Sequence, residues 1–378
     1  MSVTDDLEGI RRTARESLVP LAEQGKPGRV NRPLVRALGD TGLLPRIFPS
    51  RFGGSSDRDV DATTLCRLRE GLAYVTTEAE TALALQGLGT YPIVQSAGEE
   101  VAQRYVPRIA AGELVAAFAL TEPDAGSDAA AISLRAERAD GGWRLTGEKR
   151  WISNAPDADV YTVFARTTEG AGARGVSAFV VEAGDDGLTG EPVDLISPHA
   201  IGSLAFDGVL VPEDRLLGDL DGGFRVAMDT LDLFRPSVGA FAVGMAQAAL
   251  DAAVGHARSR QAFGRPIAEF QAISHAIADM ATQVETSRLL VYAAASAYDE
   301  GREDEVTWRS AMAKLHATET AQRVVDAAIQ VHGARALEQG HLLEHLYRDV
   351  RATRIYEGTS EIQRNIIARE LLRAPADA

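Results

Sequence analysis

One carboxylate near the C-terminus, Glu357, is a candidate for a catalytic base. It lies in the segment 354–364, Arg-Ile-Tyr-Glu-Gly-Thr-Ser-Glu-Ile-Gln-Arg, directly before a glycine and a Thr-Ser pair. Ser360 and Gln363 have the Ser-x-x-Gln spacing of a capping box, which predicts a helix that begins there. Glu357 is therefore expected on a short turn just outside a helix N-terminus. Taken alone, such a carboxylate is either a charge partner of that helix or a base that points into a cavity.

Three further segments carry residues suited to chemistry. They are 118–128 (Phe-Ala-Leu-Thr-Glu-Pro-Asp-Ala-Gly-Ser-Asp), 147–154 (Gly-Glu-Lys-Arg-Trp-Ile-Ser-Asn) and 260–273, which contains Arg-Gln-Ala-Phe-Gly-Arg-Pro-Ile and Phe-Gln-Ala-Ile. Together with 354–364, in this order, they resemble the signatures of the acyl-CoA dehydrogenases, FAD-dependent enzymes that desaturate acyl thioesters. The resemblance extends from Phe118 to Arg364.

The chemistry that this resemblance implies needs a base and a hydride acceptor. Desaturation removes a proton from Cα and a hydride from Cβ, so a positioned base and a group that stabilises the enolate-like oxygen are required. Flavin N5 accepts the hydride. The resemblance makes Glu357 the base, with its backbone N–H and a flavin ribityl hydroxyl on the thioester oxygen. In isovaleryl-type members the base lies in a Leu-Asp-x-Glu-Arg context, but 231–235 reads Leu-Asp-Leu-Phe-Arg with Phe234 at that place, which favours Glu357.

The resemblance also implies which residues contact cofactor and substrate. Residues matching those that line the flavin ring are Phe118, Leu120, Thr121, Gly126, Ser127, Trp151 and Ser153. Residues matching those that hold the FAD diphosphate and adenosine across a subunit interface are Arg260, Phe263, Gln330 and Gly333, and cofactor contacts are also expected at Thr359 and Glu361. Substrate contacts are expected at Ser127, Asp232, Arg235, Tyr356 and Gly358. The shared cofactor site implies a homo-oligomer, a dimer or, as is usual in the family, a tetramer.

Composition excludes several other classes of protein. A chain of 378 residues with 45% hydrophobic and 25% charged residues is typical of a globular protein of two or three domains. A net charge of −15 argues against nucleic acid as a partner. The polar acidic segment 1–6 resembles no signal or transit peptide, and the single cysteine, Cys66, fits a reducing compartment, so we expect a cytoplasmic protein. Lysine occurs only at positions 26, 149 and 314, an arginine-rich bias that suggests a GC-rich bacterial gene.

Hydrophobic periodicity divides the chain into three regions. Residues 1–115 have helical spacing, 116–217 contain short alternating runs, and 218–378 are again helical with breaks near 263–266, 300–304 and 333–340. In the middle region we expect a hairpin over 133–147 with its turn at 140–142, and strands at 160–166, 176–181 and 204–212. This order is that of the acyl-CoA dehydrogenase fold, an α+β fold. The resemblance implies a C-terminal four-helix bundle, with flavin between it and the β domain.

Two motifs point elsewhere, and we expect neither to be functional. Residues 170–175 match G-x-G-x-x-G, but a strand pattern follows where a dinucleotide site needs a helix, so we expect a hairpin loop. Residues 341–345 match H-x-x-E-H, a zinc pattern, which we interpret as a surface helix with two solvated imidazoles. Four arginines lie near the C-terminal segment: Arg348, Arg351, Arg354 and Arg364. They form either an anion site or a solvated helix face paired with Asp349 and Glu361.

The sequence thus predicts FAD-dependent α,β-dehydrogenation of an acyl-CoA, with an electron-transfer flavoprotein as electron acceptor. The segment 195–203 is short and has no Lys or Arg, and Ala334 with Arg335 replaces part of a usual Gly-Gly pair. Both differences lie where the family binds flavin or the carrier arm. They keep three alternatives open: an enzyme of the same fold acting on a carrier-protein-bound acyl group, a flavin oxidase or monooxygenase, and a flavin-binding homologue without turnover.

Overall fold

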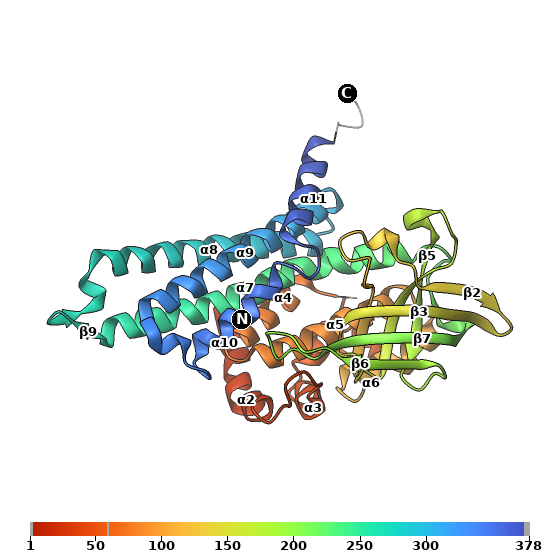
Figure 1. Ribbon diagram of the computed structural model, residues 1–378, viewed down its shortest axis with the longest axis horizontal. Coiled ribbons are helices and arrows are strands. Elements are labelled where there is room, and N and C mark those ends of the chain that lie inside the picture. The colour runs from red at the N-terminus through yellow and green to blue at the C-terminus, as the bar shows by residue number, and fades with distance from the viewer. Residues whose placement is uncertain (1–2, 59, 374–378) are drawn as a thin grey trace. The chain divides into compact units, whose positions relative to one another are not determined.

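The computed structural model describes residues 3–58 and 60–373 (Figure 1). They form two compact units. The bundle unit contains the residues up to Arg12, Ala62–Thr77 and the residues from Asp232 onward, and the sheet unit contains Thr13–Asp61 and Glu78–Leu231. Residues 1 and 2 of the polar N-terminal segment, and the outer ends of the first and last predicted regions, lie outside the described residues.

Helices precede the sheet in the chain, as the periodicity predicts. They are α1 (Val3–Thr13), α2 (Val19–Ala22), α3 (Arg32–Asp40), α4 (Ala62–Ala73), α5 (Thr77–Ser96) and α6 (Glu99–Ala110). The helix α3 shows the local rules clearly: the Asn31 side chain accepts a hydrogen bond from the Leu34 N–H, and Pro33 occupies the first turn. Its buried face, Leu34 and Leu38, is spaced four residues apart.

One eight-stranded sheet forms the centre of the sheet unit in the described part of the chain. Its strands are β1 (Ala116–Ala119), β2 (Arg135–Ala139), β3 (Gly142–Ser153), β4 (Val160–Arg166), β5 (Val176–Glu182), β6 (Leu188–Pro192), β7 (Ile201–Pro212) and β8 (Leu216–Leu217). The order is β6-β7-β3-β2-β4-β5-β8, with β1 parallel to β4. The predicted 133–147 hairpin is confirmed as β2–β3, and the predicted strands as β4, β5 and β7 (Figure 1). The G-x-G-x-x-G segment lies between β4 and β5, an antiparallel pair, so the hairpin-loop interpretation is confirmed.

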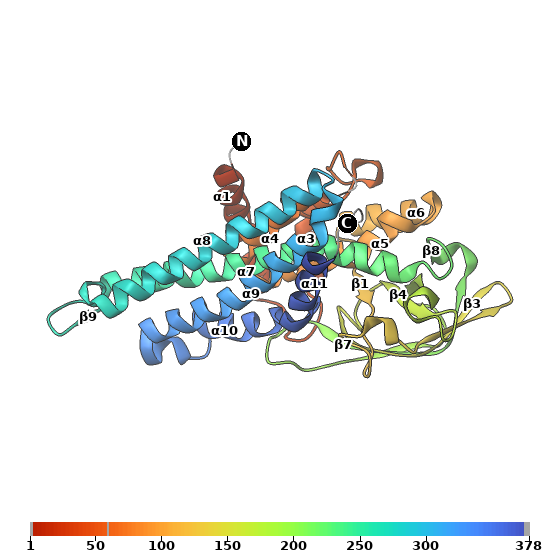
Figure 2. The same ribbon diagram turned by 90° about the horizontal axis from the view of Figure 1, so that it is seen from above.

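Long helices dominate the bundle unit. They are α7 (Gly223–Ser259), which enters it at Asp232, α8 (Gln271–Asp299), α9 (Glu303–His332), α10 (Leu342–Thr353) and α11 (Ser360–Leu372). The three predicted breaks separate these helices. A small hairpin of β9 (Gln261–Ala262) and β10 (Arg265–Pro266) joins α7 to α8 at one end of the unit (Figure 2).

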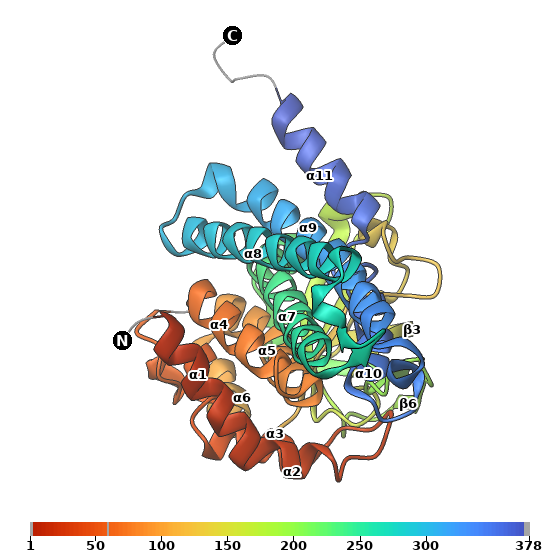
Figure 3. The same ribbon diagram turned by 90° about the vertical axis from the view of Figure 1, so that its left-hand side faces the viewer.

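Glycine allows these helices to approach closely. A Cβ on Gly239 of α7 would lie 2.7 Å from Val291 Cγ2 on α8 and 3.3 Å from the Ala313 carbonyl oxygen on α9. The three helices therefore pack without a side chain at this crossing, and α8 and α9 lie side by side (Figure 3). Among the described helices α7 alone is long and apolar enough to cross a membrane, but 72% of that stretch is buried, as expected for a core helix.

Candidate active site

The turn between α10 and α11 holds Glu357 in a strained conformation. Glu357 has φ 51° and Gly358 has φ 90°, so two consecutive residues are left-handed. A non-glycine residue in this region costs about 1–3 kcal/mol, and such strain is concentrated at functional sites. The prediction that Glu357 lies just outside a helix N-terminus is confirmed, since α11 begins at Ser360.

The capping box predicted at Ser360 and Gln363 is wrong. Thr359 is the N-cap, because its hydroxyl accepts a hydrogen bond from the Ile362 N–H at 3.3 Å. The Ser360 hydroxyl donates to Glu319 Oε1 instead, at 2.7 Å. Gln363 reaches back further than a capping box requires: its Nε2 donates to the carbonyl oxygens of Glu357 and Gly358, both at 3.0 Å. The left-handed turn exposes these carbonyls, and satisfying them takes precedence over the cap.

The Glu357 carboxylate is desolvated and close to positive charge. Its Oε2 is buried and has no hydrogen-bond partner among residues 3–58 and 60–373. Burial raises the pKa of Glu357, while Arg69, Lys314 and Arg235 oppose the increase. A partnerless carboxyl oxygen with a perturbed pKa is suited to take a proton from a bound molecule.

Two of the predicted substrate residues form an ion pair beside this turn. Arg235 of α7 is 5% exposed and its Nη1 contacts Asp232 Oδ1. The second oxygen of Asp232 accepts a hydrogen bond from the Thr307 hydroxyl at 2.8 Å. Tyr356, directly before the proposed base, is 38% exposed. The bundle unit thus brings the C-terminal signature and the Asp232–Arg235 pair together.

The sheet unit carries the residues predicted to contact the flavin ring. Phe118 lies on β1, and its ring centroid is 4.9 Å from that of Phe164. Gly126 and Ser127 lie in the exposed loop that follows, while Leu120 is buried. The Thr121 carbonyl accepts a hydrogen bond from the Arg150 N–H at 3.0 Å, which joins the signature segments 118–128 and 147–154.

Trp151 is presented by an irregularity in β3. The register of β3 against β7 shifts between Lys149 and Ile152, and Trp151 within this shift has φ 55°. Bulges of this kind often redirect a side chain next to an active site. The indole is 45% exposed, so Trp151 is not part of the hydrophobic core. Two residues later, Ser153 Oγ lies 2.8 Å from His199 Nε2.

A buried ion pair holds the same two signatures together. Lys149 is 0% and Glu122 is 3% exposed, and Lys149 Nζ lies 2.8 Å from Glu122 Oε1. Lys149 Nζ also donates to the Leu120 carbonyl at 2.9 Å. The carboxylate accepts further bonds from the backbone N–H groups of Ser133 and Leu134, at 2.6 and 3.0 Å. Sequence reasoning missed this pair; the signal was that the chain has only three lysines and one of them lies in a signature.

The predicted diphosphate and adenosine residues lie at the end of the bundle unit. Arg260 and Phe263 belong to the α7–α8 connection, and Gln330 and Gly333 to the end of α9. Phe263 is 96% exposed with φ 50°. Nearby, the His332 ring centroid lies 4.3 Å from that of His256 and 5.5 Å from that of His341. Burial lowers the pKa of His256, and so do His332, Arg335 and Arg260, which shows that cationic groups gather here.

The H-x-x-E-H segment is structural, but its imidazoles are not simply solvated as predicted. His341 is the N-cap of α10, since its Nδ1 accepts from the Leu343 N–H at 3.1 Å. His345 Nε2 lies 2.7 Å from Thr77 Oγ1 and 3.1 Å from Asp349 Oδ2. Within residues 3–58 and 60–373, His, Cys, Asp and Glu form no group of three that could hold a metal ion.

The arginines near the C-terminus are mostly paired within the helices. Arg348 Nε lies 2.6 Å from Glu344 Oε1, a carboxylate that the prediction did not name. Arg354 lies 3.3 Å from Glu319. Arg364 lies 3.9 Å from Glu361, as the helix-face alternative predicted. These pairs favour that alternative over an anion site.

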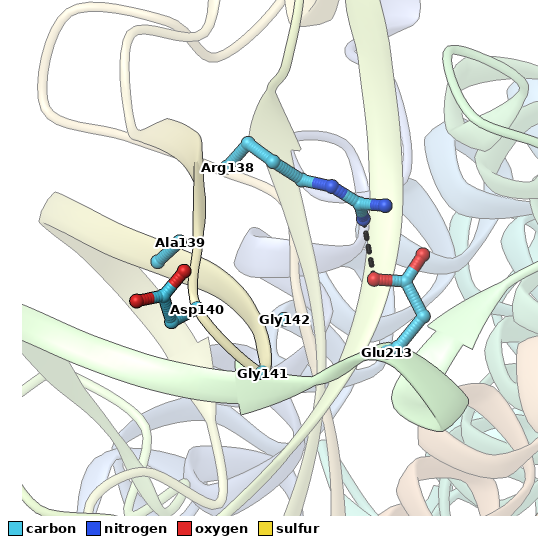
Figure 4. Close-up of a pocket in the computed structure, with 6 residues that line it drawn as sticks. All are labelled: Arg138, Ala139, Asp140, Gly141, Gly142 and Glu213. Atoms are coloured by element: carbon cyan, nitrogen blue, oxygen red, sulfur yellow. Dashed lines mark hydrogen bonds and ion pairs between the residues drawn. The ribbon is translucent and has the colours of Figure 1, made fainter.

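A surface pocket elsewhere contains none of the predicted site residues. It lies at the β2–β3 turn, where Arg138 pairs with Glu213 above the glycines of the turn (Figure 4). Both side chains are more than half exposed. The pocket therefore offers no desolvated group for chemistry.

Comparison with known proteins agrees with this geometry. Family models described as the N-terminal, middle and C-terminal domains of acyl-CoA dehydrogenase match residues 7–113, 117–209 and 221–372. Cyclohexane-1-carbonyl-CoA dehydrogenase of Geobacter metallireducens is 36% identical over 373 residues, which cover 98% of this chain and 97% of that protein.

Solved structures give the same result. Butyryl-CoA dehydrogenase from Megasphaera elsdenii is 34% identical with a TM-score of 0.92, and the match covers 98% of each chain. PigA with FAD and proline is 29% identical with a TM-score of 0.92, again over 98% of each chain. The predicted α+β fold is therefore confirmed, with a helical N-terminal, a β middle and a helical C-terminal part. This chain belongs to the acyl-CoA dehydrogenase family.

Proposed function

We propose that this enzyme oxidises an acyl-CoA to the α,β-unsaturated thioester, with Glu357 as the base and FAD as the cofactor. The observation that carries the proposal is the buried, partnerless Oε2 of Glu357 on its strained turn. The names of relatives support an acyl-CoA as the substrate, because they include cyclohexane-1-carbonyl-CoA and butyryl-CoA dehydrogenases.

The proposed proton transfer depends on the charge of Glu357. As a carboxylate, Glu357 would take the proton from Cα at its Oε2, and its backbone N–H would donate to the thioester oxygen. Burial raises the pKa of Glu357, and positive charge from Arg69, Lys314 and Arg235 opposes this increase and so favours the carboxylate form. Bound substrate would remove more water and make the carboxylate a stronger base.

The residues present fit an FAD site. Trp151 and Phe263 are both left-handed and largely exposed aromatics, a costly combination that a bound ring system would justify. Phe118, Ser127 and Ser153 would hold the flavin ring, and Arg260 and Gln330 the diphosphate and adenosine. When bound, FAD supplies the hydride acceptor. We further propose a cytoplasmic homo-oligomer, in keeping with the family norm a tetramer, and an electron-transfer flavoprotein as electron acceptor.

One feature favours a second candidate, a thioester carried by a protein. The stretch between β6 and β7 has no Lys or Arg over 195–203, and Leu195 and Ile196 are 43% and 65% exposed. An exposed apolar stretch without cations suits a protein carrier better than the phosphates of CoA.

The test is anaerobic titration of the yellow holoenzyme with a panel of acyl-CoAs and a matching acyl-carrier-protein, followed by flavin absorbance. We expect bleaching by at least one acyl-CoA. Glu357→Gln should keep its flavin and lose bleaching, while Glu338→Gln, a change of an exposed glutamate before α10, should bleach like the wild type. Bleaching by the carrier-protein thioester alone selects the second candidate. Wild-type bleaching in Glu357→Gln would show that another residue is the base.

A further inference from the structure

We propose that Lys314 is a positioning residue that fixes the turn carrying Glu357 and places a positive charge beside its carboxylate. This inference rests on the proposed role of Glu357 as the base. Lys314 lies in α9, forty residues before the start of the segment 354–364.

The contact between Lys314 and the turn is direct. Lys314 is 0% exposed, and its Nζ donates a hydrogen bond to the Gly358 carbonyl oxygen at 2.6 Å. The same oxygen accepts from Gln363 Nε2, which also binds the Glu357 carbonyl oxygen. Two donors from two helices thus hold the carbonyls of the two left-handed residues. Rotation of the turn, which would swing the Glu357 side chain away, would break these bonds.

A purely structural role does not explain a lysine here. A buried ammonium is costly unless an opposite charge compensates it. The one hydrogen-bond acceptor found for Lys314 Nζ among the described residues is a neutral carbonyl. Burial lowers the pKa of Lys314 to about 8, and Glu357 is the strongest influence that raises it. The compensating charge is therefore the base itself.

Lys314 differs from the other cations around Glu357. Arg69 on α4 donates to Ser237 Oγ at 2.7 Å, and Arg235 on α7 is paired with Asp232. Both act on Glu357 electrostatically. The acidic groups that act on Lys314 besides Glu357 are Glu319 on α9 and Glu361 on α11. Lys314 combines the contact with the turn and the charge beside the base.

The two roles predict separate effects of substitution. In Lys314→Met the positive charge is lost, so the Glu357 carboxylate protonates more readily. The acidic limb of the rate profile, the pH range in which the rate falls as Glu357 becomes protonated, therefore moves to higher pH. The limiting rate falls about 10- to 100-fold, the size expected when a hydrogen bond from a charged donor is removed. KM should change little, because the Lys314 side chain is 0% exposed. Lys314→Arg keeps the charge and should keep the limb near its wild-type position.

The experiment measures the rate of anaerobic flavin bleaching by the substrate across pH in holoenzymes of equal flavin content. Lys26→Met is the matched control, since Lys26 is exposed and lies in the sheet unit. Gln363→Met removes the second donor but no charge, so it should lower the rate without moving the limb. If Lys314→Met does not fold, the comparison of Lys314→Arg with Gln363→Met still separates charge from turn geometry.

The results that overturn the inference are distinct from those that overturn the proposed function. A wild-type rate in Lys314→Met, or a rate that falls equally at every pH, refutes the paired role while Glu357→Gln remains inactive. If only Lys314→Arg and Gln363→Met fold, the paired role is refuted when the acidic limb of the rate profile shifts in Lys314→Arg, whether or not it also shifts in Gln363→Met. Wild-type bleaching in Glu357→Gln instead refutes Glu357 as the base, and the inference with it.

Discussion

The buried pair of Lys149 and Glu122 should be the most sensitive single feature of the sheet unit. Lys149→Met keeps the length of the side chain but removes the ammonium that lies 2.8 Å from Glu122 Oε1 and 2.9 Å from the Leu120 carbonyl. It leaves a carboxylate that is 3% exposed without its opposite charge. Removing one partner of a buried ion pair costs about 3–5 kcal/mol of folding free energy. Glu122 keeps backbone donors from Ser133 and Leu134, so we expect the lower half of this range.

The measurement is thermal unfolding of the wild type, Lys149→Met and the double variant Glu122→Gln/Lys149→Met. For a unit of this size the single substitution should lower Tm by about 2–4 °C per kcal/mol lost. The two backbone N–H groups donate to different oxygens of Glu122, so in the double variant the glutamine oxygen keeps one of these bonds, and no uncompensated charge remains. We therefore expect it to be more stable than Lys149→Met, by about 1–3 kcal/mol.

The pH dependence checks the same reasoning independently. Although burial raises the pKa of Glu122, Lys149 and the backbone donors lower it below its ordinary value. The stability that comes from this depression is present above the ordinary carboxyl pKa and is lost as pH falls through the folded-state pKa. Lys149→Met raises the pKa of Glu122, so its deficit should shrink on acidification. A wild-type Tm for Lys149→Met, a double variant no more stable than the single one, or a deficit that grows at low pH would each contradict the assigned pair.

Two further predictions concern the bundle unit. Gly358→Ala should lower the bleaching rate at least tenfold with flavin retained, because φ is 90° and the new Cβ would lie 2.6 Å from Gln363 Nε2; a wild-type rate would show that the turn is not constrained. His345→Ala should lower Tm modestly, because losing the Thr77 hydrogen bond costs about 1 kcal/mol of stability. Zinc added to the wild type should not co-purify with the protein, since His341 Nδ1 accepts a backbone N–H. Stoichiometric zinc by elemental analysis would reverse the structural interpretation of this helix.

The sequence predicted elements well wherever the pattern was local. The hairpin at 133–147 follows from a polar turn with glycine between alternating runs, and each break in the C-terminal helices follows from glycine or proline. The capping box failed for a physical reason. Thr359 caps α11, and the Gln363 side chain binds carbonyls that only the three-dimensional turn exposes.

Contacts between distant segments were beyond the sequence. The hydrogen bonds of Arg69 with Ser237 and of Lys314 with Gly358 join residues that no sequence motif connects. Both His345 and His341 lie in a motif that suggests metal, and only their partners show that they stabilise helices. Resemblance supplied the candidate base, but the orphaned oxygen of Glu357 is a property of the folded chain.

The rarity of lysine becomes informative once the structure is known. Arginine serves nearly all surface cation roles in this chain, and two of the three lysines, Lys149 and Lys314, are fully buried. An ammonium is a compact charge, and one of its three donors can bind a backbone carbonyl. Both lysines do this next to a signature, at the carbonyls of Leu120 and Gly358. They differ in charge balance: Lys149 is neutralised by a carboxylate bound to it, whereas the charge of Lys314 is compensated by the candidate base itself. Lys149 should therefore govern stability, and Lys314 the pH dependence of the reaction.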